Sequence, residues 1–385
     1  MAGRVAPYID NTGLVFAYDQ ANIVRSYLGE PTTNLATNTP SLGGWPGSYT
    51  VIDSDTKTFD FTTSTVEWGG DASWTTFYYN VSAYTGQYVT ISATFEYASD
   101  PNKFNFLWIG QTSGSETYLG YSSEADRNQK STDDREDISW SGVIGSGGKV
   151  GILIWMSNGN STTVTARISN IQVEVKSHKT PFTTGTRSVT QGLKDLTGRS
   201  TIDLTNVSFD ANAQMTFDGT NDVISLSPVP EINERDYSLE TVVYRASTGV
   251  THGIWSDLQY GFFGVFIDTD NKVHFRHMTN PTYVSTELIS NTSINVGTYH
   301  IVNTYSLTGG FKTYVNGVLD VSTSATTIYN LTGRGLNKLG VYESGAPSNA
   351  NSLNGKIHLA KVYYRTLPAS EIQQNFNAIK GRYGL

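Results

Sequence analysis

Carboxylates that could act as a catalytic pair are rare in this 385-residue sequence. Hydrolysis of a glycosidic bond needs two such groups about 5–10 Å apart, and one strand can present them in a Glu-x-Asp-x-(x-)Glu pattern. Glu124 and Asp126 begin this pattern, but Arg127, Asn128 and Gln129 follow in place of a second glutamate. The surrounding residues are typical of a loop rather than a strand. We therefore expect no glycosidase centre.

Other catalytic arrangements are missing from the sequence as well. It contains no Gly-x-Ser-x-Gly elbow, and the glycine-rich run 142–149 is not a P-loop because Val150 follows the lysine where Ser or Thr is required. No His-Glu-x-x-His array occurs. His274 and His277, three residues apart on or beside a predicted strand, should lie on opposite faces of the sheet, which excludes a shared metal. The sequence therefore predicts a protein that is not an enzyme, has no catalytic residues and carries no cofactor.

Two aspartate-rich segments offer oxygen ligands for a structural calcium ion. Their candidate ligands are Asp218 and Asp222 in one segment and Asp268 and Asp270 in the other. Neither segment fits an EF-hand loop. Both also stand where hairpin turns favour Asp and Asn, so a turn without an ion is the alternative interpretation.

Sugar binding usually uses an aromatic platform together with a few fixed polar groups. Trp45, Trp68 and Trp74 lie in Gly-rich polar segments, and they are our glycan-binding candidates. A structural role beneath a loop explains them equally well. Trp108 and Trp155 lie inside apolar runs, where we expect core residues.

Length and composition indicate a folded β protein. The chain is long enough for two domains with full-sized cores, since domains mostly hold about 100–200 residues. Aromatic residues make up 12% of the sequence, 23 of them are tyrosines, and charged residues make up only 16%. This composition excludes a disordered chain.

Charge and cysteine content exclude several classes of partner and site. The net charge is −8, from 26 basic and 34 acidic residues, and no basic run occurs. Nucleic-acid binding needs clustered Lys and Arg, so we exclude it. The lack of cysteine removes disulfides and thiolate metal sites and permits assembly in a reducing cytoplasm. Residues 1–10 lack a signal-peptide pattern, so we expect synthesis in the cytoplasm. No stretch approaches the length of a membrane span, about 18 apolar residues, so we expect no membrane insertion.

Antiparallel strands are the dominant secondary-structure signal. Two β-rich runs on either side of Asn316 and Gly317 predict a two-residue type I′ hairpin, because both central residues need φ > 0. Along residues 311–315, Lys312 and Tyr314 alternate with residues suited to a core, which predicts one buried and one wet face. Further short strands with a turn signal every about 8–12 residues predict an all-β fold of sandwich or jelly-roll type.

One α-helix is predicted at the C-terminal end. Pro368 and Glu371 suit its first turn, and Gly381 suits a C-terminal stop. Its apolar positions recur at i, i+4 and i+7: Ile372, Phe376 and Ile379. A helix this short is marginal alone, so its apolar stripe should dock on the sandwich or on a partner.

Four motifs occur in the order found in one family of sandwiches. They are Phe-Asp-Gly-Thr-Asn-Asp at 217–222, Tyr-Ser-Leu-Glu-Thr-Val-Val at 237–243, Tyr-Val-Asn-Gly-Val at 314–318 and Leu-Asn-Gly-Lys-Ile at 353–357. With the closing helix, they resemble the laminin-G-like (concanavalin A-like lectin) sandwiches found in virion proteins of tailed phages. The resemblance covers roughly residues 190–385.

The same resemblance predicts that a second domain interrupts the sandwich. Residues 13–18 form a predicted strand, and its continuation (19–22, with Ser26 and Tyr27) resembles the opening of the family. The turn that should follow soon after, Asp195-Leu-Thr-Gly198, comes about 170 residues later. A surface loop whose ends lie close together tolerates such an insertion. The predicted parts are an N-terminal arm (1–12), a discontinuous laminin-G-like sandwich (13–30 and 187–385) and an inserted jelly-roll domain (34–180).

The inserted segment has motifs of its own. Gly-Gln-Tyr-Val-Thr-Ile at 86–91 and Ile-Ser-Asn-Ile-Gln-Val-Glu at 168–174 resemble jelly-roll carbohydrate-binding modules. These motifs occur across many such modules, so the resemblance implies a fold more than a particular ligand.

The resemblance to phage proteins implies a structural protein on the virion surface, as a capsid decoration or a small tail or fibre appendage subunit. Expected partners are other virion proteins, further copies of this chain as a homo-oligomer, and a surface glycan. A glycan-binding adhesin or receptor-binding protein is the alternative, and a polysaccharide depolymerase is a third hypothesis.

Overall fold

The computed structural model describes residues 11–44, 47–63, 73–111, 127–130, 132, 134–156, 164–232, 234–257, 263–278, 285–328, 335–342 and 351–385. The chain divides into two compact units. The split unit consists of residues 1–30, 189–210 and 214–385, and the inserted unit consists of residues 31–188 and 211–213. Their sheets are antiparallel and a helix ends the chain, which confirms the predicted all-β fold class.

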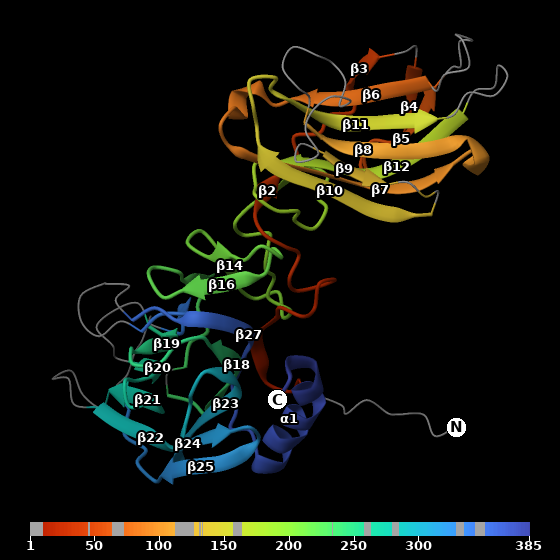
Figure 1. Ribbon diagram of the computed structural model, residues 1–385. Coiled ribbons are helices and arrows are strands. Elements are labelled where there is room, and N and C mark those ends of the chain that lie inside the picture. The colour runs from red at the N-terminus through yellow and green to blue at the C-terminus, as the bar shows by residue number, and fades with distance from the viewer. Residues whose placement is uncertain are drawn as a thin grey trace, which may run out of the picture. The chain divides into compact units, whose positions relative to one another are not determined.

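Two sheets build the split unit (Figure 1). One has eight strands in the order β15-β16-β27-β18-β23-β24-β25, with β1 also paired to β27. These strands are β1 (Leu14–Asp19), β15 (Ser208–Phe209), β16 (Met215–Asp218), β18 (Tyr237–Arg245), β23 (Gly297–Ser306), β24 (Gly310–Val315), β25 (Val318–Thr323) and β27 (Asn354–Tyr363). The other has seven strands in the order β14-β17-β26-β19-β20-β21-β22. These strands are β14 (Thr201–Asp203), β17 (Ile224–Ser227), β19 (His252–Ser256), β20 (Phe263–Ile267), β21 (Lys272–Met278), β22 (Ser285–Ser293) and β26 (Lys338–Leu339).

Alternate residues of both sheets form the core of this unit. In β20 and β21 the core side chains are Phe263, Val265, Ile267, Val273 and Phe275. Trp255 of the neighbouring β19 is fully buried, and its indole N–H donates to the hydroxyl of Thr241 at 2.8 Å. This satisfied donor allows a large amphipathic ring to fill the core without leaving a polar group unpaired.

The hairpin between β24 and β25 forms as predicted. Asn316 and Gly317 have φ values of 50° and 79°, as a type I′ turn requires. The expectation of a wet second face was wrong for Tyr314, which is only 3% exposed. Tyr314 belongs to a second apolar cluster with Ile372 of the C-terminal helix, so this helix covers the face that the strand pattern left polar.

The helix α1 (Ala369–Tyr383) follows β27 (Figure 1). Its predicted stripe is confirmed, because Ile372 and Ile379 are buried against the sheet. The predicted stop at Gly381 was wrong: Gly384 takes the left-handed conformation with φ 71° and ends the helix. Both glycines suit a C-terminal stop, and the hydrogen bonding of the last turn selects the later one. Among the described residues, no helix has the length and apolarity needed to cross a membrane.

β1 precedes the inserted unit in the chain but pairs with β27 near the other end. Asp195 holds it there. Its Oδ1 accepts the backbone N–H groups of Ala17 and Thr197, and its Oδ2 accepts those of Arg199 and Ser200, all at 3.0 Å. One carboxylate thus joins β1 to a turn 178 residues away.

Asp195→Ala should lower the free energy of unfolding by about 3 kcal/mol, because hydrogen bonds to charged groups contribute about 1.5–3 kcal/mol each and some of the four donors regain water. Asp203→Ala is the matched control, since the Asp203 carboxylate accepts, among the described residues, only the nearby N–H and hydroxyl of Thr205. We expect it to cost less than about 1 kcal/mol. Urea unfolding followed by circular dichroism measures both, and equal losses would contradict the long-range role of Asp195.

Two five-stranded sheets build the inserted unit, in the orders β10-β7-β12-β5-β4 and β3-β6-β11-β8-β9. The first sheet contains β4 (Gly47–Asp53), β5 (Thr58–Thr63), β7 (Tyr88–Ala98), β10 (Glu136–Val143) and β12 (Val164–Glu174). The second contains β3 (Ser41–Gly44), β6 (Ser73–Asn80), β8 (Phe104–Gln111), β9 (Arg127–Lys130) and β11 (Lys149–Met156). Apolar residues of both sheets, such as Ile91, Phe95, Ile109 and Ile152, form its core.

The inserted unit closes on itself where the chain enters and leaves it. β2 (Thr32–Thr33) pairs with β13 (Thr186–Arg187), so the unit extends past the predicted end at residue 180 to residue 188. Glu174 is fully buried and accepts hydrogen bonds from the Thr32 hydroxyl at 2.9 Å and the Thr180 hydroxyl at 2.7 Å. These contacts bring the two ends of the insertion together, as tolerance of an inserted domain requires.

Candidate functional site

The predicted glycan-binding tryptophans fall largely outside the described residues. Trp45 and Trp68 lie outside them altogether. Trp74 pairs by its backbone with Trp155 in the sheet of β6 and β11, but its side chain lies outside the described part. Glycan binding by these three residues stays a prediction. Trp108 differs from the core residue expected, because it is only half-buried and its indole donates to Gln129 at 2.8 Å.

The first pair of calcium candidates stabilises a turn. Asp222 is buried and accepts the N–H groups of Ser208 at 3.1 Å and Asp218 at 2.6 Å. Asp218 in turn accepts the N–H of Thr220 at 2.7 Å. Burial raises the pKa of Asp222, and the hydrogen bond from the Asp218 N–H opposes that rise. The oxygens proposed as ligands therefore serve backbone donors.

The second pair behaves in the same way. Asp268 accepts the N–H of Thr269 at 2.7 Å, and Asp270 accepts the N–H of Lys272 at 2.8 Å while lying 3.2 Å from His274 Nε2. Within the described ranges, no group of three or more His, Cys, Asp or Glu side chains is arranged to hold a metal ion. Turn formation accounts for the aspartates at all four positions.

His274 and His277 lie on opposite faces of the sheet, as predicted. His274 stacks on Phe266, with ring centroids 5.0 Å apart, and its Nδ1 lies 2.7 Å from Glu287 Oε1 on the face away from the core. His277 packs against Phe263 in the core, with centroids 5.7 Å apart. The two imidazoles cannot share a ligand.

A β-bulge in the inserted unit exposes an aromatic ring that sequence reasoning did not single out. β7 and β12 change register between Arg167 and Ile168, which leaves Glu96 as an extra residue in β7. The adjacent Tyr97 is 41% exposed on the face that turns away from the core.

Arg167 and Asp60 lie beside this ring in a fixed arrangement. Arg167 donates to Asp60 through two parallel hydrogen bonds, Nε to Oδ1 at 2.7 Å and Nη2 to Oδ2 at 2.8 Å. The guanidinium carbon lies 5.3 Å from the centroid of the Tyr97 ring. A bidentate pair of this kind orients the guanidinium plane and leaves outer donors and acceptors for a ligand.

Glu96 adds a second charged pair to the same surface. It accepts a hydrogen bond from Arg135 Nε at 2.7 Å and another from the Ser169 hydroxyl. Burial alone would raise the pKa of Glu96, but the bonds from Ser169 and Arg135 outweigh it and lower the pKa. We name the surface formed by Asp60, Glu96, Tyr97, Arg135 and Arg167 the Tyr97 face.

The neighbouring part of this sheet face is covered by residues 176–180, which we name the strap. The Thr90 hydroxyl donates to the carbonyl of Lys176 at 2.9 Å, and the N–H of Thr180 donates to Glu174 at 2.9 Å. Thr90 and Glu174 are both 0% exposed, although neither faces the apolar core. The strap therefore covers Thr90 and Glu174 and leaves both ends of β7 accessible, at Tyr88 and at Tyr97.

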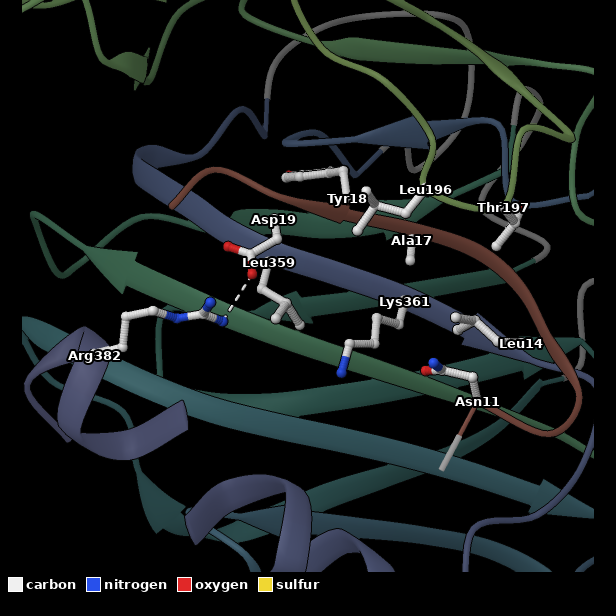
Figure 2. A pocket seen from close by; sticks show the side chains of 10 residues that line it. All are labelled: Asn11, Leu14, Ala17, Tyr18, Asp19, Leu196, Thr197, Leu359, Lys361 and Arg382. Carbon is white, nitrogen blue, oxygen red and sulfur yellow. Dashed lines mark ion pairs between the residues drawn. The ribbon is translucent and has the colours of Figure 1, made fainter. Parts of the chain in front are cut away.

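The split unit contains a second candidate, a cleft of about 460 Å³ (Figure 2). Its lining comes from β1, the turn after residue 194, β27 and the end of α1. Leu14, Leu196 and Leu359 give it apolar walls. This volume lies within the range of about 300–1,000 Å³ that is common for ligand pockets.

Charged groups lie at two places in the cleft. At one, Arg382 of α1 pairs with Asp19 of β1, with Nη2 and Oδ2 2.7 Å apart (Figure 2). At the other, the Lys361 side chain lines the cleft although only 9% of it is exposed. Lys361 donates to Glu240 Oε2 at 3.0 Å.

Glu240 is the centre of a buried polar network behind Lys361. Its Oε1 lies 3.1 Å from His300 Nε2, and its Oε2 also accepts the Tyr363 hydroxyl at 3.1 Å and the Asn375 amide at 3.2 Å. Burial alone would raise the pKa of Glu240, but Lys361 and His300 outweigh burial and lower the pKa to about 2. The carboxylate is therefore charged throughout the physiological pH range.

For the Tyr97 face and the cleft together, the sequence contained only one signal. Lys361 interrupts an apolar strand run, and a charged residue at such a position usually has a buried partner. The pairing of Asp19 with Arg382 has no local signal, because the two residues are near opposite ends of the chain. Tyr97 was missed because its exposure results from the bulge, which the strand pattern does not encode.

Comparison with known proteins supports a lectin-like fold for the split unit. Residues 218–373 match the concanavalin A-like lectin/glucanases superfamily. No protein with a curated description matches the sequence.

Solved structures with partial similarity include the binding domain of Paraclostridial Mosquitocidal Protein 1, with 18% identity and a TM-score of 0.38 over 48% of this chain and 49% of that one. The receptor binding domain of botulinum neurotoxin D has 14% identity and a TM-score of 0.38 over 50% of this chain and 51% of that one. The CBM40 of the Ruminococcus gnavus IT-sialidase, bound to alpha2,3 sialyllactose, has 14% identity and a TM-score of 0.32 over 37% of this chain and 83% of that one.

This chain therefore spans about half the length of the first two structures. With TM-scores below 0.5, none of the three adds to the assignment. The assignment rests on the superfamily match together with the two packed antiparallel sheets. Residues 218–373 of this chain have the laminin-G-like, concanavalin A-like lectin fold.

Proposed function

We propose that this protein binds carbohydrate and has no catalytic activity of its own. The observation that carries the proposal is the match of residues 218–373 to a superfamily of lectins and glucanases. Because one fold hosts many functions, the proposal also needs a surface that suits a sugar. The Tyr97 face offers one, in the inserted unit and outside the matched residues.

The chemistry of the Tyr97 face suits a pyranose ring. An exposed aromatic ring can stack on the apolar side of a sugar, while fixed polar groups bind its hydroxyls. Tyr97 supplies the ring, and the paired Arg167 and Asp60 supply donors and acceptors held in place by each other. All three stand on strands, which position them more firmly than loops do.

Tyr97→Ala should weaken glycan binding at least tenfold, a loss of about 1.4 kcal/mol, because stacking on an exposed ring contributes about that much. Tyr88→Ala is the matched control: Tyr88 is the first residue of the same strand and is 53% exposed. A glycan array identifies the ligand, and calorimetry with the full chain measures the change. Equal losses in both variants would place the sugar elsewhere.

A depolymerase is the competing function from a different class, and the superfamily includes glucanases. Incubating the full chain with polysaccharide and measuring reducing ends tests it. Release of product that stops in Asp60→Asn or Glu96→Gln would replace binding with hydrolysis. We expect no release, because the sequence lacks the carboxylate pattern of a glycosidase.

At a more specific level, we propose that the protein is a surface subunit of a tailed-phage virion, as a capsid decoration or a tail or fibre appendage. It rests on the order of the four motifs from 217–222 to 353–357. Its partners would be other virion proteins, further copies of this chain and a surface glycan. Cryo-electron microscopy of the source particles tests it, because density for both units on a capsid or tail would support it.

A binding assay with the purified chain distinguishes an adhesin from a capsid decoration. Binding to purified capsids alone favours decoration. Binding to cells or polysaccharide that Tyr97→Ala abolishes favours an adhesin.

A further inference from the structure

The cleft of the split unit differs from the Tyr97 face in its chemistry. It is a hollow of about 460 Å³ with both apolar walls and charged groups, whereas the Tyr97 face is an open sheet surface. Its lining comes from residues far apart in the chain, including Leu14, Leu196, Leu359 and Arg382. Such a built hollow selects a ligand by shape as well as by charge.

The Lys361 ammonium group has N–H donors that its hydrogen bond to Glu240 does not use. An ammonium group carries three N–H donors. One of them reaches Glu240, and among the described residues the others have no acceptor. Because the side chain lines the cleft while only 9% of it is exposed, an acceptor bound there would reach a poorly hydrated cation.

Arg382 provides a second cation that is able to turn toward a ligand. Its side chain is 43% exposed, and its partner Asp19 does not depend on it alone. Asp19 also accepts the Tyr383 hydroxyl at 2.5 Å and the N–H of Ala21 at 3.0 Å. Asp19 therefore stays hydrogen-bonded when the guanidinium moves to bind a ligand carboxylate, the group that it fits bidentately.

The remaining lining defines the rest of the ligand. The side chains that line the cleft include two cations, Lys361 and Arg382, and one anion, Asp19, so their net charge is +1. The amide of Asn11, which bonds to no other described residue, and the leucine walls add a polar and an apolar contact. A small ring with one carboxylate, several hydroxyls and an apolar side satisfies all of these groups.

We propose that the cleft between β1, β27 and α1 binds a carboxylate-bearing sugar unit of an acidic glycan, with Lys361 and Arg382 as its anion-binding residues. This proposal rests on the carbohydrate-binding function and adds a second site with its own substrate class. The sugar carboxylate lies between the two cations, and its ring packs on Leu196 and Leu359.

A glucuronate-containing oligosaccharide and the same oligosaccharide with its carboxyls reduced to alcohols test the proposal on the full chain. Calorimetry at fixed salt should show at least tenfold tighter binding of the acidic form. Arg382→Gln should remove that preference. Lys380→Gln is the matched control, because it removes the same charge from the last turn of the same helix without touching the cleft lining.

Leu196→Glu provides a second, independent test at a position that is 42% exposed, where folding should not suffer. A negative charge at the rim should weaken the acidic oligosaccharide at least tenfold more than the reduced one, which loses only the packing of its ring on Leu196. Thermal unfolding of each variant checks that the fold is kept.

Several results would overturn the inference. Equal binding of the acidic and reduced forms would remove the role of the carboxylate, and an equal loss in Lys380→Gln would show a general charge effect. Displacement by acetate at the same concentration as the sugar would show a simple anion site. Glycan binding that Tyr97→Ala abolishes and Arg382→Gln leaves intact would end this proposal alone, whereas no binding of any glycan would end the proposed function as well.

Discussion

Glu240→Gln should lower the free energy of unfolding of the split unit by about 3–5 kcal/mol, the usual cost of removing one partner from a buried ion pair. Glu240 is 0% exposed, and its two oxygens accept from four donors: His300, Lys361, Tyr363 and Asn375. The amide would leave the Lys361 ammonium without a countercharge and would place N–H groups against at least one existing donor. Since Asn375 belongs to α1, the docking of this helix should weaken too.

Hydrogen exchange of peptides from β18 and β23 measures this effect within the split unit alone. The matched variant is the double substitution Glu240→Gln with Lys361→Met, which removes the orphaned charge and should recover at least half of the loss. A loss below about 1 kcal/mol in the single variant would contradict a buried charge, because surface ion pairs contribute only that much. An additive double variant would show that the two side chains do not interact.

Acidification should destabilise the protein between pH 6.5 and pH 4, and His277 should account for one proton of that effect. The imidazole is 0% exposed and packs between Phe263 and Tyr305. Within the described part of the chain it makes one hydrogen bond, to the carbonyl of Met278 at 3.0 Å. Burial lowers the pKa of His277 to about 4, and the bond to Met278 opposes this only in part. The folded state therefore keeps the ring neutral where the unfolded chain takes up a proton.

The direction of this pH effect follows from the different numbers of protons that the folded and unfolded states bind. Above pH 6.5 both states are neutral at this residue, so its contribution is constant. Below pH 6.5 the unfolded state binds more protons, and stability falls by about 1.4 kcal/mol per pH unit until the folded pKa is reached, about 3 kcal/mol in total. The effect is present only in that window.

His277→Phe should reduce the slope of unfolding free energy against pH by one proton between pH 6.5 and pH 4.5. His252 offers an internal comparison, because burial and the nearby Arg245 also lower its pKa to about 4. His252→Asn should also reduce the slope of unfolding free energy against pH, by the equivalent of one further proton. Urea unfolding at half-unit pH intervals measures both, and an unchanged slope in His277→Phe would show that this ring is not held neutral.

Much of the local structure was determined by the sequence alone. Asn316 and Gly317 made the type I′ turn because few other residues accept φ > 0 at both positions. The spacing of Ile372 and Ile379 set which face of α1 is buried. The order of the motifs from 217 onward indicated the laminin-G-like fold, which the superfamily match supports.

The tertiary structure decided the surfaces that could bind a ligand. Tyr97 is exposed because β7 carries an extra residue opposite β12, and the strap covers Thr90 and Glu174 on the same sheet face. The cleft requires β1 to pair with β27, and one carboxylate that accepts a donor 178 residues away helps to hold β1 there. Turns and periodic faces depend on neighbours in the chain, whereas these sites depend on side chains that only folding brings together. Apart from Lys361, the local sequence pattern therefore gave no signal for them.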